Sequence, residues 1–352
     1  MSEPLVSIIM PVYQVEAYVA RAIESILKQS YVHFEFFIVN DGSPDNSDEI
    51  CLRYSRKDPR IRYLSQRNCG AFAARNHAID LAQGKYLYFM DSDDWAEMHM
   101  LRDMVAVAEE TQSEYVVSGY YIDTYYTEEK FITQKVCGER AFFETRQDFR
   151  NAAAMLLDHG LMYAPWNKLF LRSRVEELGL RFPATRMDDF PFNLGYMRDV
   201  SRVAVMPEAY YHFQRARSDS ETARYMPSMY EKREEEHIWL EEIFAYWQLN
   251  DAASREFLAR RYCERALGCI ENLMRAPKEV GYAQRLAETK QILQNERLVR
   301  LLKTARPRTR MLKLMFIPMK WRAARLCMLE CRIIALARSR FTRIFAILKA
   351  QR

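Results

Sequence analysis

The stretch KYLYFMDSDDW, residues 85–95, joins a run of apolar residues to a cluster of three aspartates. Its first six residues, KYLYFM, predict a buried β-strand. Asp91, Asp93 and Asp94 follow that strand directly, and each close pair of carboxylates repels by roughly 1 kcal/mol even in water. A positively charged group is therefore expected among these three side chains.

Strands and helices alternate on the N-terminal side of this stretch. The predicted order is strand 6–10, helix 16–30, strand 34–40, helix 48–57, strand 61–65, helix 71–83 and strand 85–90. Such alternation indicates a parallel sheet with helices on its faces, joined by right-handed crossovers. The predicted fold class is α/β, a mostly parallel, Rossmann-like sheet flanked by helices and followed by a helical C-terminal region.

Three loops are expected at the carboxyl edge of this sheet, where ligands bind in such folds. They begin at Pro11, at Asp41 and at Asp91. The last of them offers only oxygen ligands, which suit a hard divalent ion such as Mg²⁺ or Mn²⁺ completed by substrate phosphates. Taken alone, the acidic triplet also fits a solvated turn or a helix cap. Its position after a buried strand favours the metal site.

Six segments then occur in a characteristic order: VSIIMPVYQ, IVNDGSPDNS, NCGAFAARN, GKYLYFMDSDDW, WNKLF and MDDFPFN. In order and spacing they resemble family-2 glycosyltransferases, the inverting, nucleotide-sugar-dependent enzymes with the GT-A fold. The resemblance covers residues 5–215 and is strongest to bacterial members that build lipopolysaccharide, capsule or other surface polysaccharides. The chain has Asn40 where the family often has Asp, and Gln14 where it usually has Asn.

The resemblance implies a nucleotide pocket. Pro11, Val12 and Tyr13 would form one wall, and Asp41 would accept the imide N–H of a uracil-type base, a donor that suits a carboxylate. The remaining residues implied for the nucleotide are Arg75, near the base or the diphosphate, Asp91, at the ribose, and Ser92. An ordinary place on a helix face is the alternative for Arg75.

The resemblance also implies a metal site on the acidic loop. Asp93 would bind the ion together with the diphosphate, and Asp94 would support or share that role. His212 is a further candidate ligand, although a histidine between aromatic residues also fits a structural position.

Inverting glycosyl transfer needs a base on the sugar face opposite the leaving diphosphate. In RMDDFPFN the family pattern assigns this role to the second carboxylate, Asp189, with Asp188 as its neighbour or as a ligand of the acceptor. The alternative for this acidic pair is a helix N-cap.

Two further segments are assigned to the acceptor or diphosphate side by the same resemblance. In WNKLF, Trp166 would stack on a sugar ring or belong to the core. The complete set of expected residues is Trp166, Asn167 and Lys168, and in the later segment Arg215, Arg217 and Ser220.

Charge is divided unevenly along the 352 residues. Residues 303–352 hold fourteen Lys or Arg and one acid, so they carry +13, whereas the whole chain carries +5 and the first 302 residues therefore −8. We predict a catalytic domain at 1–225, a helical extension at 226–303 and a basic amphipathic tail at 304–352. The tail is too interrupted to span a bilayer, and we expect it to lie on an anionic membrane surface. Packing on the helical region or pairing with a second subunit is the alternative.

These observations predict a Mn²⁺- or Mg²⁺-dependent inverting transferase that moves sugar from a UDP-sugar to a glycan or a polyprenyl or other lipid-linked acceptor. Seven cysteines without a disulfide or zinc pattern favour reduced thiols, so we expect a cytoplasmic protein at the inner face of the membrane. A homo-oligomer is left open. One rival is a non-catalytic nucleotide-sugar-binding module. The other is a nucleic-acid-binding protein, which the −8 charge of the first 302 residues argues against.

Overall fold

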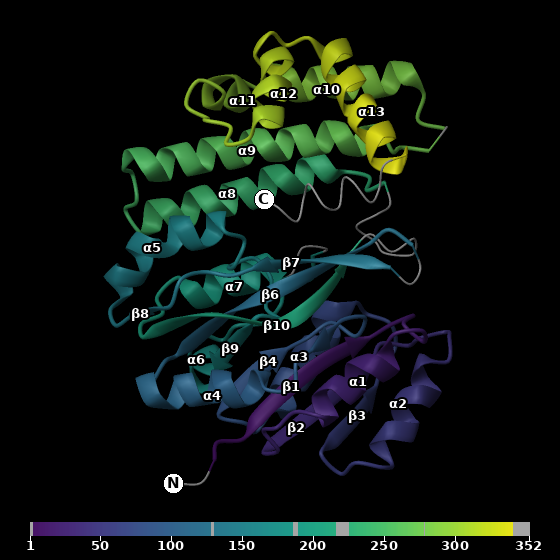
Figure 1. Cartoon of the computed structure of the whole chain (residues 1–352), viewed down its shortest axis with the longest axis vertical. Coiled ribbons are helices and arrows are strands. Elements are labelled where there is room, and N and C mark those ends of the chain that lie inside the picture. The colour runs from purple at the N-terminus through teal and green to yellow at the C-terminus, as the bar shows by residue number, and fades with distance from the viewer. Residues whose placement is uncertain (1–2, 128–129, 186–188, 216–224, 278, 341–352) are drawn as a thin grey trace. The chain divides into compact units, whose positions relative to one another are not determined.

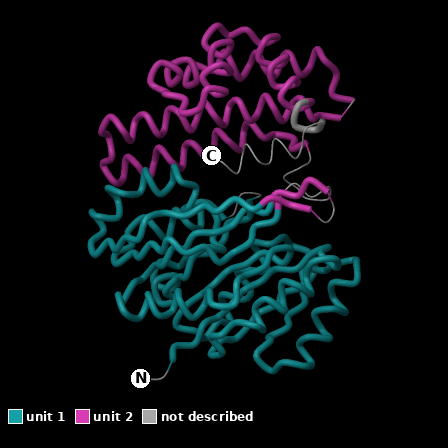
Figure 2. The backbone as a smooth tube through the Cα atoms, in the orientation of Figure 1, with its two compact units in different colours: residues 1–123, 133–214 teal, residues 124–132, 215–352 magenta. Residues whose placement is uncertain are grey.

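A computed structural model describes residues 3–127, 130–185, 189–215, 225–277 and 279–340, with side chains to residue 336 (Figure 1). The chain forms two compact units (Figure 2). Unit 1 comprises residues 1–123 and 133–214, and unit 2 comprises residues 124–132 and 215–352.

The first half of unit 1 is the predicted alternation of strands and helices. Four neighbouring strands run parallel in the order β3-β2-β1-β4, and helices connect them. Their bounds are β1 (Val6–Val12), α1 (Val19–Leu27), β2 (Phe34–Asn40), α2 (Ser47–Ser55), β3 (Ile61–Ser65), α3 (Ala71–Leu81) and β4 (Tyr86–Phe89). Every residue of β1, β2 and β4 is buried, as the continuous apolar runs predict. The predicted fold class is confirmed.

Strand β1 is longer than predicted because it continues through Pro11. A proline has no N–H to donate, so it is excluded from positions where a neighbouring strand needs that bond. The ladder between β1 and β4 ends at Ile9 and Phe89, while the ladder with β2 continues to Val12. Pro11 thus lies past the end of β4, and β1 carries on to the sheet edge.

The second half of unit 1 adds antiparallel strands to the same sheet. β9 (Lys168–Leu171) pairs with β4 and with β6 (Tyr115–Tyr125), and the full path is β3-β2-β1-β4-β9-β6-β10-β5. The other elements are β5 (Trp95–Ala96), α4 (Met100–Thr111), β7 (Phe131–Val136), β8 (Ala141–Phe143), α5 (Arg146–Asp158), α6 (Arg172–Glu177), α7 (Asp189–Met197) and β10 (Val203–Arg215). β7 pairs with β6, which confirms a hairpin in residues 123–144, where loops or a hairpin were predicted.

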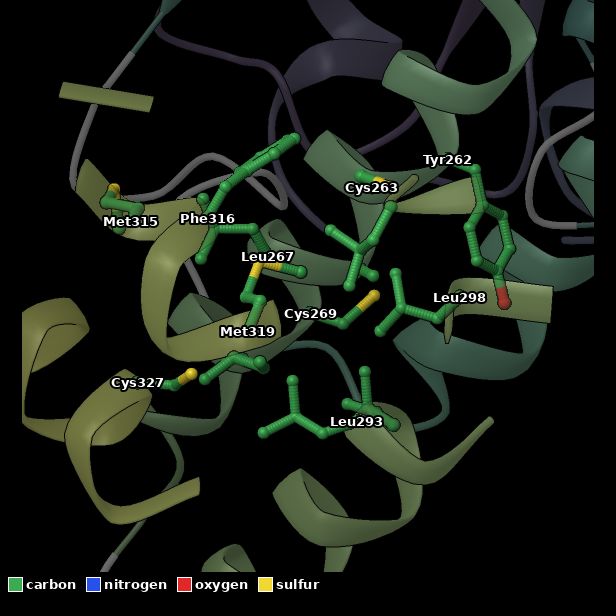
Figure 3. Packing of buried hydrophobic residues seen from close by; sticks show 14 of the residues in the cluster. Tyr262, Cys263, Leu267, Cys269, Leu293, Leu298, Met315, Phe316, Met319 and Cys327 are labelled. Carbon is green, nitrogen blue, oxygen red and sulfur yellow. The ribbon is translucent and has the colours of Figure 1, made fainter. Parts of the chain in front are cut away.

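Unit 2 is a set of packed helices. They are α8 (Met229–Tyr246), α9 (Ala252–Leu273), α10 (Tyr282–Gln294), α11 (Glu296–Leu301), α12 (Arg310–Lys320) and α13 (Ala324–Arg340). One hydrophobic cluster joins α9 to α13, and Figure 3 shows Leu267, Leu298, Phe316 and Cys327 meeting in it.

The described part of the predicted basic tail therefore packs on the other helices of unit 2, the alternative that the sequence left open. Residues 341–352 of that tail lie outside the described residues. Among the helices that the structure describes, none combines the length and the apolar character that a bilayer span requires.

Candidate active site

The acidic loop after β4 is held in place by β10. Asp94 is 1% exposed, and its two carboxylate oxygens accept hydrogen bonds from the Tyr211 hydroxyl (2.9 Å) and the Gln214 backbone N–H (2.8 Å). The backbone N–H of Asp91 donates to the same hydroxyl at 2.9 Å. One tyrosine therefore connects the first and last aspartates of the loop, while the side chains of Asp91 and Asp93 remain half-buried.

Burial changes the electrostatics of this anchor. It raises the pKa of the Asp94 carboxyl well above its usual range, and the charges of Asp93 and Asp91 act in the same direction. Burial, followed by the charge of Asp94, also raises the pKa of Tyr211, which keeps its hydroxyl a donor. Asp94 thus acts as an internal support of the loop, because it is almost fully buried and each of its oxygens accepts a hydrogen bond from β10.

Arg75 supplies a positive group among these carboxylates. It lies on α3, is 4% exposed, and its guanidinium contacts Asp91 Oδ1 at 2.8 Å and Asp189 Oδ1 at 3.1 Å. It also lies 5.1 Å from the ring centroid of Phe182. The arginine brings together two carboxylates that are almost one hundred residues apart in the sequence. Its two carboxylate partners give Arg75 a place in the candidate site, whereas the alternative was an ordinary position on a helix face.

Asp189 is the first residue of α7, and its side chain is 33% exposed. Its partner Asp188 lies outside the described residues, as do Arg217 and Ser220, while Arg215 is the last residue of β10. A carboxylate at a helix N-terminus is favoured by the helix dipole, so the N-terminal position and the Arg75 contact both stabilise the ionised form of Asp189. An ionised, accessible carboxylate is the form that can accept a proton.

The loop after β2 surrounds Asp41 with donors. Asp41 is 2% exposed and accepts hydrogen bonds from the Gln66 side chain (2.8 Å) and from the backbone N–H groups of Cys69 (2.9 Å) and Gly70 (2.7 Å). Gly42 permits this approach, because a Cβ at its φ of +69° would lie 2.9 Å from the Asn68 nitrogen. With three donors on a group that offers about four acceptor positions, Asp41 has room for one further donor.

The first loop presents a different surface from the one expected. Pro11 and Val12 are buried in β1, while Tyr13 is 43% exposed. Of these three side chains, Tyr13 is the one open to a ligand. Ser92 is 6% exposed within the acidic loop.

His212 lies between two aromatic rings on the β10 side of the acidic loop. Its imidazole stacks on Trp95, with centroids 3.6 Å apart, and on Tyr121, 4.6 Å away. Its Nδ1 lies 2.8 Å from Asp123 Oδ2, and its Nε2 lies 3.2 Å from Glu97 Oε1. Both ring nitrogens already face carboxylate oxygens, so the geometry favours a structural histidine over a metal ligand.

The segment 166–168 forms a buried support. Trp166 is 7% exposed and stacks on Tyr211 at 4.7 Å, so little of its ring is accessible for stacking on a sugar. Asn167 donates to the Ser118 carbonyl, and the Lys168 ammonium donates to the carbonyls of Leu161 (2.6 Å) and Ala164 (2.5 Å). Burial lowers the pKa of Lys168 well below its usual range, against the opposing charge of Asp189. These residues contribute packing behind the site.

The donor set for a metal is small. In the ranges that the structure describes, no three His, Cys, Asp or Glu side chains are grouped so as to hold an ion. Asp91 and Asp93 are half-buried carboxylates on one loop, and such oxygens fit Mg²⁺ or Mn²⁺, which one or two carboxylates usually hold together with substrate phosphates. The residues present therefore fit a metal that arrives with a diphosphate.

Several supporting residues were missed at the sequence level. Tyr211 and Gln214 hold Asp94, and Asp123, fully buried in β6, accepts from Thr133 and faces His212. An aspartate inside the strand-like run VVSGYYIDTYY was a usable signal, because a buried carboxylate needs partners. Tyr211 and Gln214 gave no such signal, since their role depends on pairing of β10 beside the loop.

Comparison with known proteins places this geometry in context. Residues 7–179 match the family model described as Glycosyl transferase family 2. An uncharacterized glycosyltransferase, EpsJ of Bacillus subtilis (strain 168), is 30% identical over 236 residues, which cover 66% of this chain and 68% of the relative. The minor teichoic acid biosynthesis protein GgaB of the same organism is 44% identical over 91 residues, 25% of this chain and 10% of that protein.

Among solved structures, S. aureus TarS 1-349 in complex with UDP-GlcNAc covers 94% of this chain, and the match spans 90% of the TarS chain. The TM-score is 0.64 and the sequence identity 19%. A likeness at this identity concerns the fold, and it extends over both the sheet and the helical region of the chain.

Proposed function

The chain belongs to glycosyl transferase family 2, and we propose that it is an inverting, metal-dependent transferase with a UDP-sugar donor. The observation that carries the proposal is the Arg75 bridge, which joins the acidic loop after β4 to Asp189 at the start of α7. The bridge supports the proposal because it holds the loop proposed to bind the nucleotide beside the candidate base, at the carboxyl edge of the sheet, where ligands of such sheets bind.

The donor would be held by residues of the first three loops. Tyr13 offers an exposed ring to the base, and the remaining acceptor position of Asp41 suits an imide N–H. Asp91 would lie at the ribose, Ser92 would be a further nucleotide contact, and Asp93 would hold Mg²⁺ or Mn²⁺ together with the diphosphate. Such an ion, when bound, neutralises the charge that develops on the leaving diphosphate. Asp94 would keep the loop in shape through Tyr211 and Gln214.

Asp189 is the proposed base. It would take the proton of an acceptor hydroxyl as the hydroxyl oxygen bonds to the anomeric carbon and the bond from that carbon to the diphosphate breaks, which inverts the configuration. Arg75 would orient Asp189 and keep it ionised before the proton is transferred. Asp188, Arg215, Arg217 and Ser220 remain proposed neighbours of the acceptor or the diphosphate.

The proposed acceptor is a glycan or a polyprenyl or other lipid-linked carrier in surface polysaccharide synthesis. Support comes from the relatives, since GgaB is named for teichoic acid biosynthesis and TarS was solved with UDP-GlcNAc. A lipid-linked acceptor resides in a membrane, so we propose a cytoplasmic enzyme that works at the cytoplasmic face of that membrane.

A donor panel with one base variant tests the proposal. The wild type is incubated with individual UDP-sugars and Mn²⁺, and UDP release is measured with and without a chelator. Asp189→Asn should lose roughly 10²- to 10⁴-fold in turnover, while calorimetry should still show UDP binding. Glu110→Gln, on the exposed side of α4, is the matched control and should behave as the wild type. Binding without turnover of any donor by the wild type would instead identify a nucleotide-sugar-binding module.

A further inference from the structure

Two neighbouring helices of unit 2 repeat one pattern of side chains at a spacing of twelve residues. Residues 313–321 read KLMFIPMKW, and residues 325–333 read RLCMLECRI. Position by position, the first, second, fifth, eighth and ninth residues are exposed in both segments, and the third, fourth and seventh are buried. Each exposed position holds the same kind of residue in both segments: a cation at the first and eighth, and a large apolar residue at the second, fifth and ninth.

The buried positions explain why both helices face the same way. Met315, Phe316 and Met319 of α12 and Cys327 and Cys331 of α13 all belong to the hydrophobic cluster of unit 2 (Figure 3). Because both helices bury one side in this common core, both exposed sides point away from it. The two matched segments therefore contribute to the outer surface of unit 2.

The apolar residues on this surface form stripes. At about 100° per residue, Leu314 and Ile317 of α12 and Trp321, which follows its last residue, fall within an arc of about 60°. On α13 the corresponding residues and Leu336 fall within about 80°. Seven of the seventeen large hydrophobic residues exposed in the described part of the chain lie here, with exposed fractions from 39% to 71%: Leu314, Ile317, Trp321, Leu326, Leu329, Ile333 and Leu336. A concentration of this kind marks an interaction surface.

Cations border each apolar stripe on one side. Lys313 and Lys320 lie at the edge of the α12 stripe, and Arg325 and Arg332 take the same places on α13. Between residues 303 and 336 there are nine Lys or Arg and a single acid, Glu330, whose pKa is raised by burial. The stripes are thus apolar in the middle and strongly basic at the border.

A hollow of about 310 Å³ adjoins this surface. Apolar residues and three cations line it: Val299, Leu302, Met319, Lys303, Lys320 and Arg322. Lys320 belongs both to this hollow and to the border of the α12 stripe. A cavity with several ammonium and guanidinium groups and an apolar floor suits a phosphate group attached to a hydrophobic molecule.

We propose that the outer sides of α12 and α13 form a docking surface for an anionic phospholipid membrane. The stripes enter the acyl boundary, the bordering Lys and Arg meet lipid phosphates, and the hollow at Lys320 receives a headgroup. This inference deepens the proposed location at the membrane and rests on that part of the proposed function. The membrane would thus be contacted by two helices packed in unit 2, whereas the sequence had suggested a separate basic tail.

The charge of this surface favours an anionic membrane over a second copy of the chain, and its apolar stripes favour a membrane over nucleic acid. In a second copy of the chain, the same cations would face one another, and the stretch offers only the half-buried Glu330 as a partner. Nucleic acid would match the cations, yet its interfaces are polar and would leave the two apolar stripes uncovered. An anionic bilayer satisfies the cations and the apolar stripes together.

Vesicle partition with a charge-matched control tests the surface. The full chain is sedimented with vesicles of phosphatidylcholine, with or without about one-third phosphatidylglycerol. Arg325→Gln with Arg332→Gln should weaken partition into the anionic vesicles roughly 30-fold, because each cation at such a surface contributes about fivefold. Arg56→Gln with Lys57→Gln, exposed at the end of α2 in unit 1, removes the same charge and should leave partition unchanged. Equal losses in the two double variants, or equal binding to both kinds of vesicle, would overturn the proposal.

Trp321, 71% exposed, reports on the apolar part of the surface. Anionic vesicles should shift the tryptophan emission to shorter wavelength, and Trp321→Phe should remove this shift while partition is retained. The same shift on concentrating the protein without lipid would show that a second copy covers the surface, and would overturn the proposal. Vesicle partition is measured without a sugar donor or an acceptor. If the protein does not bind the vesicles but still releases UDP from its donor, the docking surface is rejected and the proposed glycosyl transfer is not.

Discussion

Arg75 and Asp94 resolve the repulsion within the acidic loop in different ways. Arg75 places a guanidinium against Asp91 and Asp189, so two of the local carboxylates are paired. Asp94 is taken out of water and given two donors instead. Its burial disfavours the ionised form, so ionisation of Asp94 lowers the stability of the folded protein. Asp91 and Asp93 remain half-buried beside it.

This cost predicts a pH dependence that belongs to Asp94. Because its pKa is higher in the folded state than in the unfolded chain, the folded state binds the proton more tightly, and Asp94 contributes less stability as the pH rises above its usual pKa. Asp94→Asn cannot ionise. The unfolding free energy of the variant minus that of the wild type should therefore increase as the pH rises above about 4, the usual pKa of an aspartate, by at most about 1.4 kcal/mol per pH unit.

Urea unfolding at a series of pH values, without added metal, measures this difference. Glu110→Gln replaces an exposed carboxylate on α4 and should give a difference that stays flat. A difference that falls with pH for Asp94→Asn would show that the two hydrogen bonds outweigh the burial of the charge.

The helices of the predicted tail acquire their role from packing. In α12 the buried residues Met315, Phe316 and Met319 lie three or four positions apart on one side, as in any amphipathic helix. They enter the cluster formed with α9, α10 and α11 (Figure 3). Pro318 lies inside this helix without ending it at that point. The element is therefore an integral part of unit 2 and carries the docking surface on its opposite side.

Neighbouring positions on α12 separate the two sides of this helix. Phe316 is 1% exposed, and Phe316→Ala should lower the free energy of unfolding by about 3 to 5 kcal/mol, because it leaves a cavity in the cluster. Leu314, two residues earlier, is 63% exposed, and Leu314→Ala should change the free energy of unfolding by no more than about 0.5 kcal/mol. Urea unfolding followed by far-UV circular dichroism provides the comparison. Equal small effects of both substitutions would mean that α12 is not packed in solution.

On the scale of the molecule, opposite charges are assigned to different parts of the chain. The first 302 residues carry −8 and the last fifty +13. The sheet of unit 1 presents a cluster of acids at its carboxyl edge, and the last helices of unit 2 present a basic surface with apolar stripes. An acidic loop with a metal suits a nucleotide diphosphate, whereas the basic surface suits anionic lipid.

A comparison of ligands tests this assignment on the whole chain. UDP with Mn²⁺, at about one hundred times its dissociation constant, should stabilise the protein by about 2.7 kcal/mol and raise its melting temperature by several degrees. A single-stranded oligonucleotide at the same concentration should not. If the oligonucleotide raised the melting temperature and UDP did not, the proposed UDP site at the acidic loop would be rejected. Nucleic-acid binding would then be the favoured function.

Much of this protein follows from the sequence alone. Continuous apolar runs and helical periodicity correctly predicted the parallel strands and helices before residue 90, because burial on both faces of a parallel sheet leaves that pattern in the chain. The ordered motifs identified the family, which the comparisons confirm. They also directed attention to Asp91, Asp93 and Asp189, although the roles of these residues remain predictions.

Tertiary structure decided which polar residues stay accessible and which are buried as supports of the candidate site. Trp166, Lys168, His212 and Asp94 have the residue types of binding groups, yet each is buried and already has partners inside the protein. Pairing of β10 with β5 beside the acidic loop brought Tyr211 and Gln214 to Asp94. The hydrophobic cluster of unit 2 likewise decided which side of α12 is buried. Local sequence records which side chains are apolar or charged, but burial and hydrogen-bond partners arise only when segments far apart in the chain come into contact.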